Sequence, residues 1–191
     1  MLPYLLLITL MFGKVYGQMI MLTRGDWGSQ TTGVSTPEIM GSYQRVFIHH
    51  TSTAECFNIV ACSQLMKEMQ KRDVESGVWT DIRFNFVIGG DGHVYEGTGW
   101  EGQGAHTKGY ENDLGIALIG NYNGEEPVDG MLELTEALIT HGVLSGKIKR
   151  NFGLYAHSDV NCVSCPGGAL IDFNDSQAYL ARWLAPSIIT E

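Results

Sequence analysis

Residues 44–50 read QRVFIHH, a run rich in β-branched and aromatic side chains that ends in His49 and His50. This composition predicts a strand. A helix is expected next, over residues 58–72, because apolar side chains recur there at spacings of three and four residues and would share one face. These side chains belong to Ile59, Cys62, Met66 and Met69. The strand and the amphipathic helix that follows it suggest the start of an α/β arrangement.

The rest of the chain continues this alternation of strands and helices. A hairpin is expected where two apolar runs flank a glycine-rich turn, and a central strand where the run is continuously apolar. The expected elements are the hairpin over 84–96, the strand over 114–119 (LGIALI), a helix over 131–144, a short strand over 154–156 and a last helix with the stripe Leu170, Phe173, Leu180 and Leu184. We therefore predict an α/β fold with helices on the faces of a sheet.

The first seventeen residues are expected to be a signal peptide and not part of the fold. Residues 5–12 form an apolar run that is about half the ~20 residues a membrane span needs, and Val15-Tyr16-Gly17 fits a cleavage site. Because no Lys or Arg precedes the run, a buried N-terminal segment or an anchor is the alternative. Residues 18–191 fit one domain. We expect the chain to be secreted.

The formal net charge of the chain is −9 at neutral pH. An acidic surface disfavours nucleic acid and anionic lipid as partners. Beyond residue 17 no run is long and apolar enough to cross a membrane. We therefore expect no nucleic acid partner and no membrane span.

Four cysteines occur, Cys56, Cys62, Cys162 and Cys165. In an oxidising compartment they suggest two disulfides, for which three pairings are open. Cys56 and Cys62 are close enough at a helix start to bridge locally. Cys162 and Cys165 form a CxxC motif, which in a reducing compartment would suggest redox chemistry or a zinc knuckle, but a second CxxC is missing.

Three residues have the side chains of an open zinc site. His49 ends one strand, His157 ends another, and Cys165 follows His157 by eight residues. Two imidazoles and one thiolate leave a fourth position for water, as in zinc hydrolases. The other interpretation is that both histidines only end strands and that Cys165 is half of a disulfide. The residues alone leave both interpretations open.

Six segments, in this order, resemble the peptidoglycan-recognition proteins of animal innate immunity, which are similar to bacteriophage amidases. They are FIHHT (47–51), the pair Cys56/Cys62, WTDIRFNFVIGGDGHVYEG (79–97), GWEGQGAH (99–106), LGIALIGNYNG (114–124) and AHSDVNCVSCPGG (156–168). The resemblance covers roughly residues 20–184. It implies a single domain with a central mixed sheet flanked by helices, and a groove for a muropeptide.

The resemblance also implies roles for particular residues. The zinc ligands of catalytic members fall on His49, His157 and Cys165, and the family disulfide falls on Cys56 and Cys62. The reaction is hydrolysis of the amide between N-acetylmuramic acid and L-alanine. Candidates for contacts with the bound muropeptide are Thr51, Trp79, His106 and Asn112. An immune receptor or another recognition protein is the implied protein partner.

Two departures from the family pattern concern catalysis. Catalytic members have a tyrosine where this chain has Phe84, and often a lysine or threonine where it has Val163. Phenylalanine offers no hydrogen-bond donor to a developing oxyanion. Tyr95, Thr53 or Arg83 is the alternative source of that donor. We therefore expect a secreted antibacterial or signalling protein that binds peptidoglycan with weak or absent turnover; an active zinc amidase is the second hypothesis, and a CxxC redox protein the third.

Overall fold

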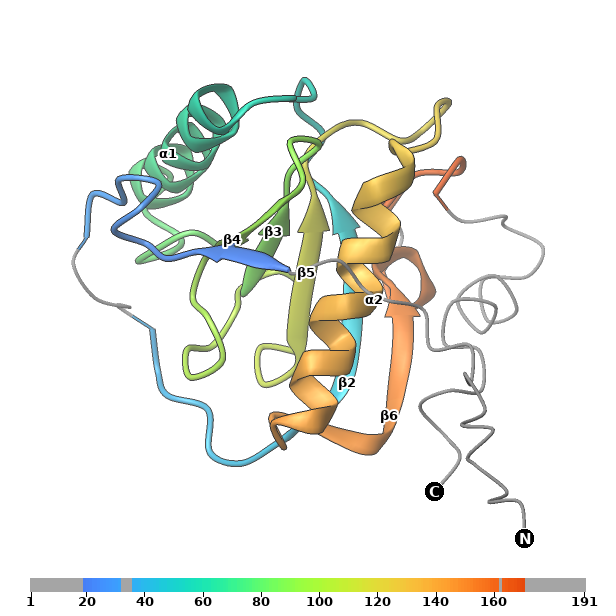
Figure 1. The fold of residues 1–191 in the computed structure, drawn as a ribbon. Coiled ribbons are helices and arrows are strands. Elements are labelled where there is room, and N and C mark those ends of the chain that lie inside the picture. Colours follow the sequence, from blue (N-terminus) through green and yellow to red (C-terminus); the bar gives the residue numbers. More distant parts are fainter. Residues whose placement is uncertain (1–18, 32–35, 162, 171–191) are drawn as a thin grey trace, which may run out of the picture.

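The computed structural model describes residues 19–31, 36–161 and 163–170. Its strands form one six-stranded sheet in the order β1-β4-β3-β5-β2-β6 (Figure 1). The strands are β1 (Ile20–Leu22), β2 (Tyr43–His50), β3 (Phe86–Ile88), β4 (His93–Glu96), β5 (Leu114–Leu118) and β6 (Ile148–Ala156). The helices are α1 (Ile59–Glu75), α2 (Asp129–Leu144) and the short 3-10 helix η1 (His157–Asp159).

The sheet is mixed, as the resemblance implied. Among the six described strands, only β3 and β4 pair in the antiparallel direction, around a tight turn in which Gly92 has a φ of 84°. The pairs β1–β4, β3–β5, β5–β2 and β2–β6 are parallel. The C-terminal ends of β5, β2 and β6 therefore lie at the same end of the sheet, and the histidines of β2 lie there.

One long helix covers each face of the sheet. Alternate side chains of β2, β3 and β5 point to opposite faces, as the strand pleat requires. Val46, Phe86 and Ile116 pack in the cluster that includes apolar residues of α2. Val87 and Ala117 pack in the cluster that includes Cys62, Met66 and Met69 of α1. The apolar stripe predicted for the first helix is thus the face that α1 buries.

The disulfide between Cys56 and Cys62 is present and joins the segment before α1 to its first turn. Its Cα atoms lie 5.2 Å apart. Asn58 caps the same helix, because its side-chain oxygen accepts a hydrogen bond from the N–H of Ala61 at 2.9 Å. Cys165 is a free thiol, so it does not pair with either of these cysteines.

The structure differs from the expected elements mainly in β1 and β6, the two outermost strands of the sheet. β6 begins at Ile148 and not near residue 154. After the buried Ile148, residues 149–151 are exposed and polar, so this part of the strand shows no apolar pattern. β1 was not expected; it has three residues and pairs only with β4. The signal peptide over 1–17, Cys162 and most of the last expected helix lie outside the described residues. Neither α1 nor α2 has the length and apolar character of a membrane-spanning helix, and no other described helix does.

Candidate functional site

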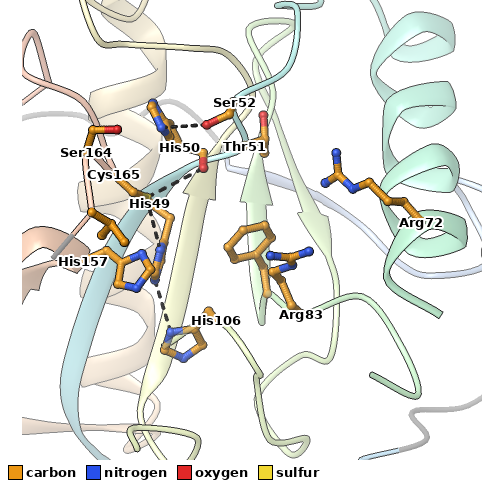
Figure 2. Close-up of a pocket in the computed structure, with 12 residues that line it drawn as sticks. His49, His50, Thr51, Ser52, Arg72, Arg83, His106, His157, Ser164 and Cys165 are labelled. Carbon is orange, nitrogen blue, oxygen red and sulfur yellow. Dashed lines mark hydrogen bonds between the residues drawn. The ribbon is translucent and has the colours of Figure 1, made fainter. Parts of the chain in front are cut away.

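His49 and His157 meet because β2 and β6 are adjacent parallel strands. Ile48 of β2 is aligned with Ala156, the last residue of β6, so His49 and His157, which follow them in the chain, lie at the same end of the two strands. The ring centroids of the two histidines lie 4.7 Å apart. Cys165 completes the group, with its Sγ 3.5 Å from Nδ1 of His49 (Figure 2). One donor atom from each of the three residues lies within 4.8 Å of the others, so the group could hold a metal ion.

Two backbone contacts hold the loop that carries Cys165. The backbone N–H of Ser158 donates to the carbonyl of Cys165 at 2.9 Å. Two residues after the cysteine, Gly167 has a φ of 103° and its backbone lies so close to Tyr122 that a Cβ there would overlap the Tyr122 carbonyl. A glycine at this position therefore allows the loop to bring the thiol against the end of β2.

Burial keeps the three donor residues uncharged at neutral pH. His49 is only 1% exposed, and this burial holds its pKa well below the ordinary value, with His106 and His157 adding to the effect. Burial also lowers the pKa of His157, and it raises the pKa of the Cys165 thiol to about 11. The site thus presents two neutral imidazoles and a protonated thiol, which would lose its proton on binding a metal.

The other ring nitrogen of His49 faces His106 and Thr107. Nε2 of His49 lies 3.2 Å from Nδ1 of His106 and 3.3 Å from Oγ1 of Thr107. On the far side of its ring, Nε2 of His106 lies 2.9 Å from the backbone carbonyl of Asp113. Burial lowers the pKa of His106 to about 4, so this imidazole is neutral as well.

His50, although adjacent to His49, is not a member of the ligand group. Its Nδ1 accepts a hydrogen bond from the N–H of Tyr122 at 3.1 Å, and its Nε2 lies 2.8 Å from Oγ of Ser52. Both ring nitrogens therefore have protein partners. Side-chain alternation along β2 determines which of the two histidines faces His157 and Cys165.

The ligand group lies in a hollow of about 390 Å³. Its described lining residues are His49, His50, Thr51, Ser52, Arg72, Arg83, Phe84, His106, His157, Val163, Ser164 and Cys165. None of these described residues carries a carboxylate, and two carry a guanidinium group. The hollow is thus lined by cations although the chain as a whole has a net charge of −9.

Phe84 and Val163, the two departures from the family pattern, both line this hollow. The ring centroid of Phe84 lies 5.4 Å from that of His49, and Val163 is 44% exposed. Of the alternative donors, Tyr95 does not lie in the described lining; it is buried, and its O–H donates to Asp91 at 2.6 Å. The hydroxyl of Thr53 lies 2.7 Å from that of Thr51.

Arg83, the third alternative donor, is held at the wall of the hollow by two neighbours. Its Nε lies 3.1 Å from both carboxylate oxygens of Asp73, and its guanidinium carbon lies 4.2 Å from the ring centroid of Trp79. Asp73 was not identified from the sequence. Its position could have indicated burial, because it falls four residues after Met69 on the apolar stripe of α1. Arg72, the other cation of the lining, had no such signal.

The four residues suggested for ligand contact are distributed unevenly. Thr51 and His106 line the hollow. Trp79 is half-buried and lies behind Arg83. Asn112 is exposed, accepts a hydrogen bond from Gln103 at 2.7 Å and borders a separate hollow beside Arg45. The structure therefore does not bring Asn112 to the metal-ligand group.

The chain is similar to a family of known proteins. The profile of the family described as N-acetylmuramoyl-L-alanine amidase matches residues 40–168. Peptidoglycan-recognition protein SC1a/b of Drosophila simulans is 32% identical over 166 residues, which cover 85% of this chain and 89% of that protein.

Two solved structures are also similar. The ectodomain complex of peptidoglycan-recognition proteins LCa and LCx with bound tracheal cytotoxin has a TM-score of 0.79 at 33% identity, covering 84% of this chain and 98% of the matched chain. The second structure is that of a mutant of Drosophila peptidoglycan-recognition protein LB, with phenylalanine in place of a tyrosine, in complex with tracheal cytotoxin. It has a TM-score of 0.77 at 37% identity, covering 83% of this chain and 95% of the matched chain.

Proposed function

Because the chain belongs to the peptidoglycan-recognition protein family, we propose that it binds fragments of bacterial peptidoglycan in the hollow around His49, His157 and Cys165 and cleaves them slowly or not at all. Its role would be in innate immunity. The observation that carries the proposal is the combination of a complete metal-ligand group with Phe84, which has no hydroxyl, beside it.

The charge of the hollow supports an anionic ligand of this kind. Peptide stems of peptidoglycan end in carboxylates, and guanidinium groups bind carboxylates through paired hydrogen bonds. Arg72 and Arg83 provide two such groups, although the Asp73 carboxylate behind the lining lies 3.1 Å from Nε of Arg83 and 3.9 Å from Nε of Arg72. Two similar proteins have structures with tracheal cytotoxin, a monomeric peptidoglycan of the diaminopimelic acid type. Thr51 lines the hollow and is proposed as a further ligand contact.

The donor types, and the separation of one donor pair, fit zinc. Bonds of about 2.0 Å to nitrogen and 2.3 Å to sulfur at a tetrahedral angle place the two donor atoms about 3.5 Å apart, which is the separation of His49 Nδ1 and Cys165 Sγ, 3.5 Å. We propose that His49, His157 and Cys165 hold one zinc ion. When bound, zinc polarises a carbonyl oxygen and activates a water molecule. The residues of the chain would orient the muropeptide amide against it.

Turnover is expected to be weak because a developing oxyanion needs a positioned donor. Losing one such donor costs about 10²–10³ in turnover in other hydrolases. Phe84 lies where catalytic relatives are expected to have a tyrosine, and Arg83 is already engaged with Asp73. The alternative function is an active amidase, favoured by the intact ligand group. In that case another group, for which Arg83 in the lining of the hollow is a candidate, would donate to the oxyanion.

We also propose that the protein is extracellular, with residues 1–17 removed as a signal peptide. The Cys56–Cys62 disulfide supports this, because such bonds persist in oxidising compartments. A second recognition protein is a candidate partner, since the similar LCa and LCx ectodomains form a complex with each other.

The test is to measure muropeptide binding by calorimetry and hydrolysis of the muramoyl–alanine amide, each with and without added zinc. The proposal expects binding together with hydrolysis that stays slow when zinc is saturating. Brisk zinc-dependent hydrolysis would favour the amidase instead. If the protein bound neither a diaminopimelate-type nor a lysine-type muropeptide, the proposed function would be overturned.

A further inference from the structure

We propose that His106 is a positioning residue for His49: it fixes the tautomer that presents the Nδ1 lone pair of His49 to His157 and Cys165. The inference rests on the proposed metal site for its consequence, but its geometric basis is independent of any ion. It assigns His106 a role beneath the ligand group rather than against the bound muropeptide.

The direction of the hydrogen bonds begins at Asp113. A backbone carbonyl only accepts, so Nε2 of His106, 2.9 Å from the Asp113 oxygen, must carry the ring proton. A neutral imidazole has one N–H, and His106 is only 5% exposed, with no described carboxylate or cation among its hydrogen-bond partners. Nδ1 of His106 is therefore an acceptor.

This acceptor determines the state of His49. Nε2 of His49 lies 3.2 Å from Nδ1 of His106, and two lone pairs at that distance would repel each other. The hydroxyl of Thr107 does not change the outcome. It lies 2.9 Å from Nδ1 of His106, to which it can donate while its oxygen accepts from Nε2 of His49 at 3.3 Å. His49 consequently carries its proton on Nε2, and its Nδ1 lone pair faces Sγ of Cys165, 3.5 Å away.

The surroundings of His106 leave its ring little freedom. A Cβ at Gly104 would lie 2.6 Å from the imidazole, and one at Gly115 would overlap it, so two glycine backbones enclose the ring. The residue whose carbonyl accepts the hydrogen bond from His106 is also held, because the Asp113 side chain accepts a hydrogen bond from Arg45 at 2.9 Å. A chain of contacts thus runs from Arg45 through Asp113 and His106 to the metal-ligand group.

Two substitutions separate this role from simple packing. His106→Asn places an amide oxygen near the position of Nδ1 and so keeps an acceptor for His49, although it fills less space. His106→Leu fills more of the space but removes the acceptor. A positioning role expects zinc affinity near that of the unsubstituted protein for His106→Asn and a 10–100-fold weaker affinity for His106→Leu. If His106 only fills space, His106→Leu should bind zinc more tightly than His106→Asn.

The experiment combines zinc affinity, measured by competition with a chelator, with the His49 tautomer in the metal-free protein, measured by long-range ¹⁵N–¹H NMR. His141→Gln is the matched control, because His141 is exposed on α2 and absent from the described lining of the hollow. We expect an Nε2–H tautomer of His49 in the unsubstituted protein, in His106→Asn and in the control, and its loss in His106→Leu. Thermal unfolding of each variant checks that it is folded.

Two results would overturn the inference: an Nδ1–H tautomer of His49 in the unsubstituted protein, or zinc affinity in a folded His106→Leu equal to that of the unsubstituted protein. Failure of the unsubstituted protein to bind zinc would instead refute the metal site. The NMR measurement of the His49 tautomer in the unsubstituted protein and in His106→Asn would still test the role of His106. This measurement does not require His106→Leu to fold.

Discussion

The rings of Phe84 and His49 lie with their centroids 5.4 Å apart, so the residue at position 84 faces the metal-ligand group directly. Phe84 also lines the hollow that contains this group. This relationship makes position 84 the most direct test of why turnover should be weak.

Phe84→Tyr is expected to raise amide hydrolysis by about two to three orders of magnitude while changing muropeptide affinity little, because a donor used only in the transition state affects turnover and not ground-state binding. Steady-state kinetics and calorimetry on the same preparation measure both quantities. Phe57→Tyr makes the same chemical change at a residue that is 60% exposed on the segment before α1, and should leave both unchanged. If the unsubstituted protein already hydrolyses briskly and Phe84→Tyr has no effect, another group supplies the donor.

Zinc affinity is expected to depend on Cys165 and on pH. Cys165→Ser should abolish stoichiometric zinc binding, because a hydroxyl is a far poorer zinc ligand than a thiolate. Burial raises the pKa of the Cys165 thiol to about 11, so one proton leaves when zinc binds near neutral pH. The apparent association constant should therefore rise about tenfold per pH unit between pH 7 and 8.5. Metal analysis and chelator competition test both; affinity independent of pH would exclude the thiol as a ligand.

Arg83 is expected to contribute charge to ligand binding. Arg83→Gln keeps a hydrogen-bond donor for the buried Asp73 but removes the cation, and should weaken muropeptide binding about tenfold or more. The loss should shrink at high salt, because ions screen a partly exposed charge. Arg150→Gln, on the exposed part of β6, is the matched control. Equal affinities for the two variants would show that Arg83 does not contact the ligand.

The metal-free protein should lose stability in mild acid. The pKa of His106 falls from an ordinary 6.5 to about 4 on folding, so the unfolded chain binds more protons between these values. Stability is therefore fully present above about pH 6.5 and decreases as the pH falls, by up to about 3 kcal/mol from this residue. The lowered pKa values of His49, His50 and His157 act in the same direction. Urea unfolding from pH 7.5 to 4.5 measures the slope, which should be shallower in His106→Asn; an equal slope would contradict the assignment to His106.

Local patterns were sufficient for the elements of the core. The period of apolar residues in α1 and the continuous apolar run of β5 both report burial, and burial on one or both faces is a local property of the sequence. The same patterns failed for β6, in which residues 149–151 are exposed and polar. An edge strand is stabilised by backbone pairing with its neighbour, which leaves no periodic signal in its side chains.

The sequence by itself determined the apolar period of α1 and the alternation that turns His49 and His50 to opposite faces. Both follow from spacings of a few residues along one element. The candidate ligand set and the Cys56–Cys62 pairing came from the resemblance to a family and not from the residues alone. Only the tertiary structure decided that the strand ends carrying His49 and His157 are neighbours, that Asp73 holds Arg83 at the hollow, and that His106 lies against Nε2 of His49. Those contacts depend on strand register and on packing between segments distant in sequence, so their energies are set by three-dimensional proximity and leave no periodic trace in the chain.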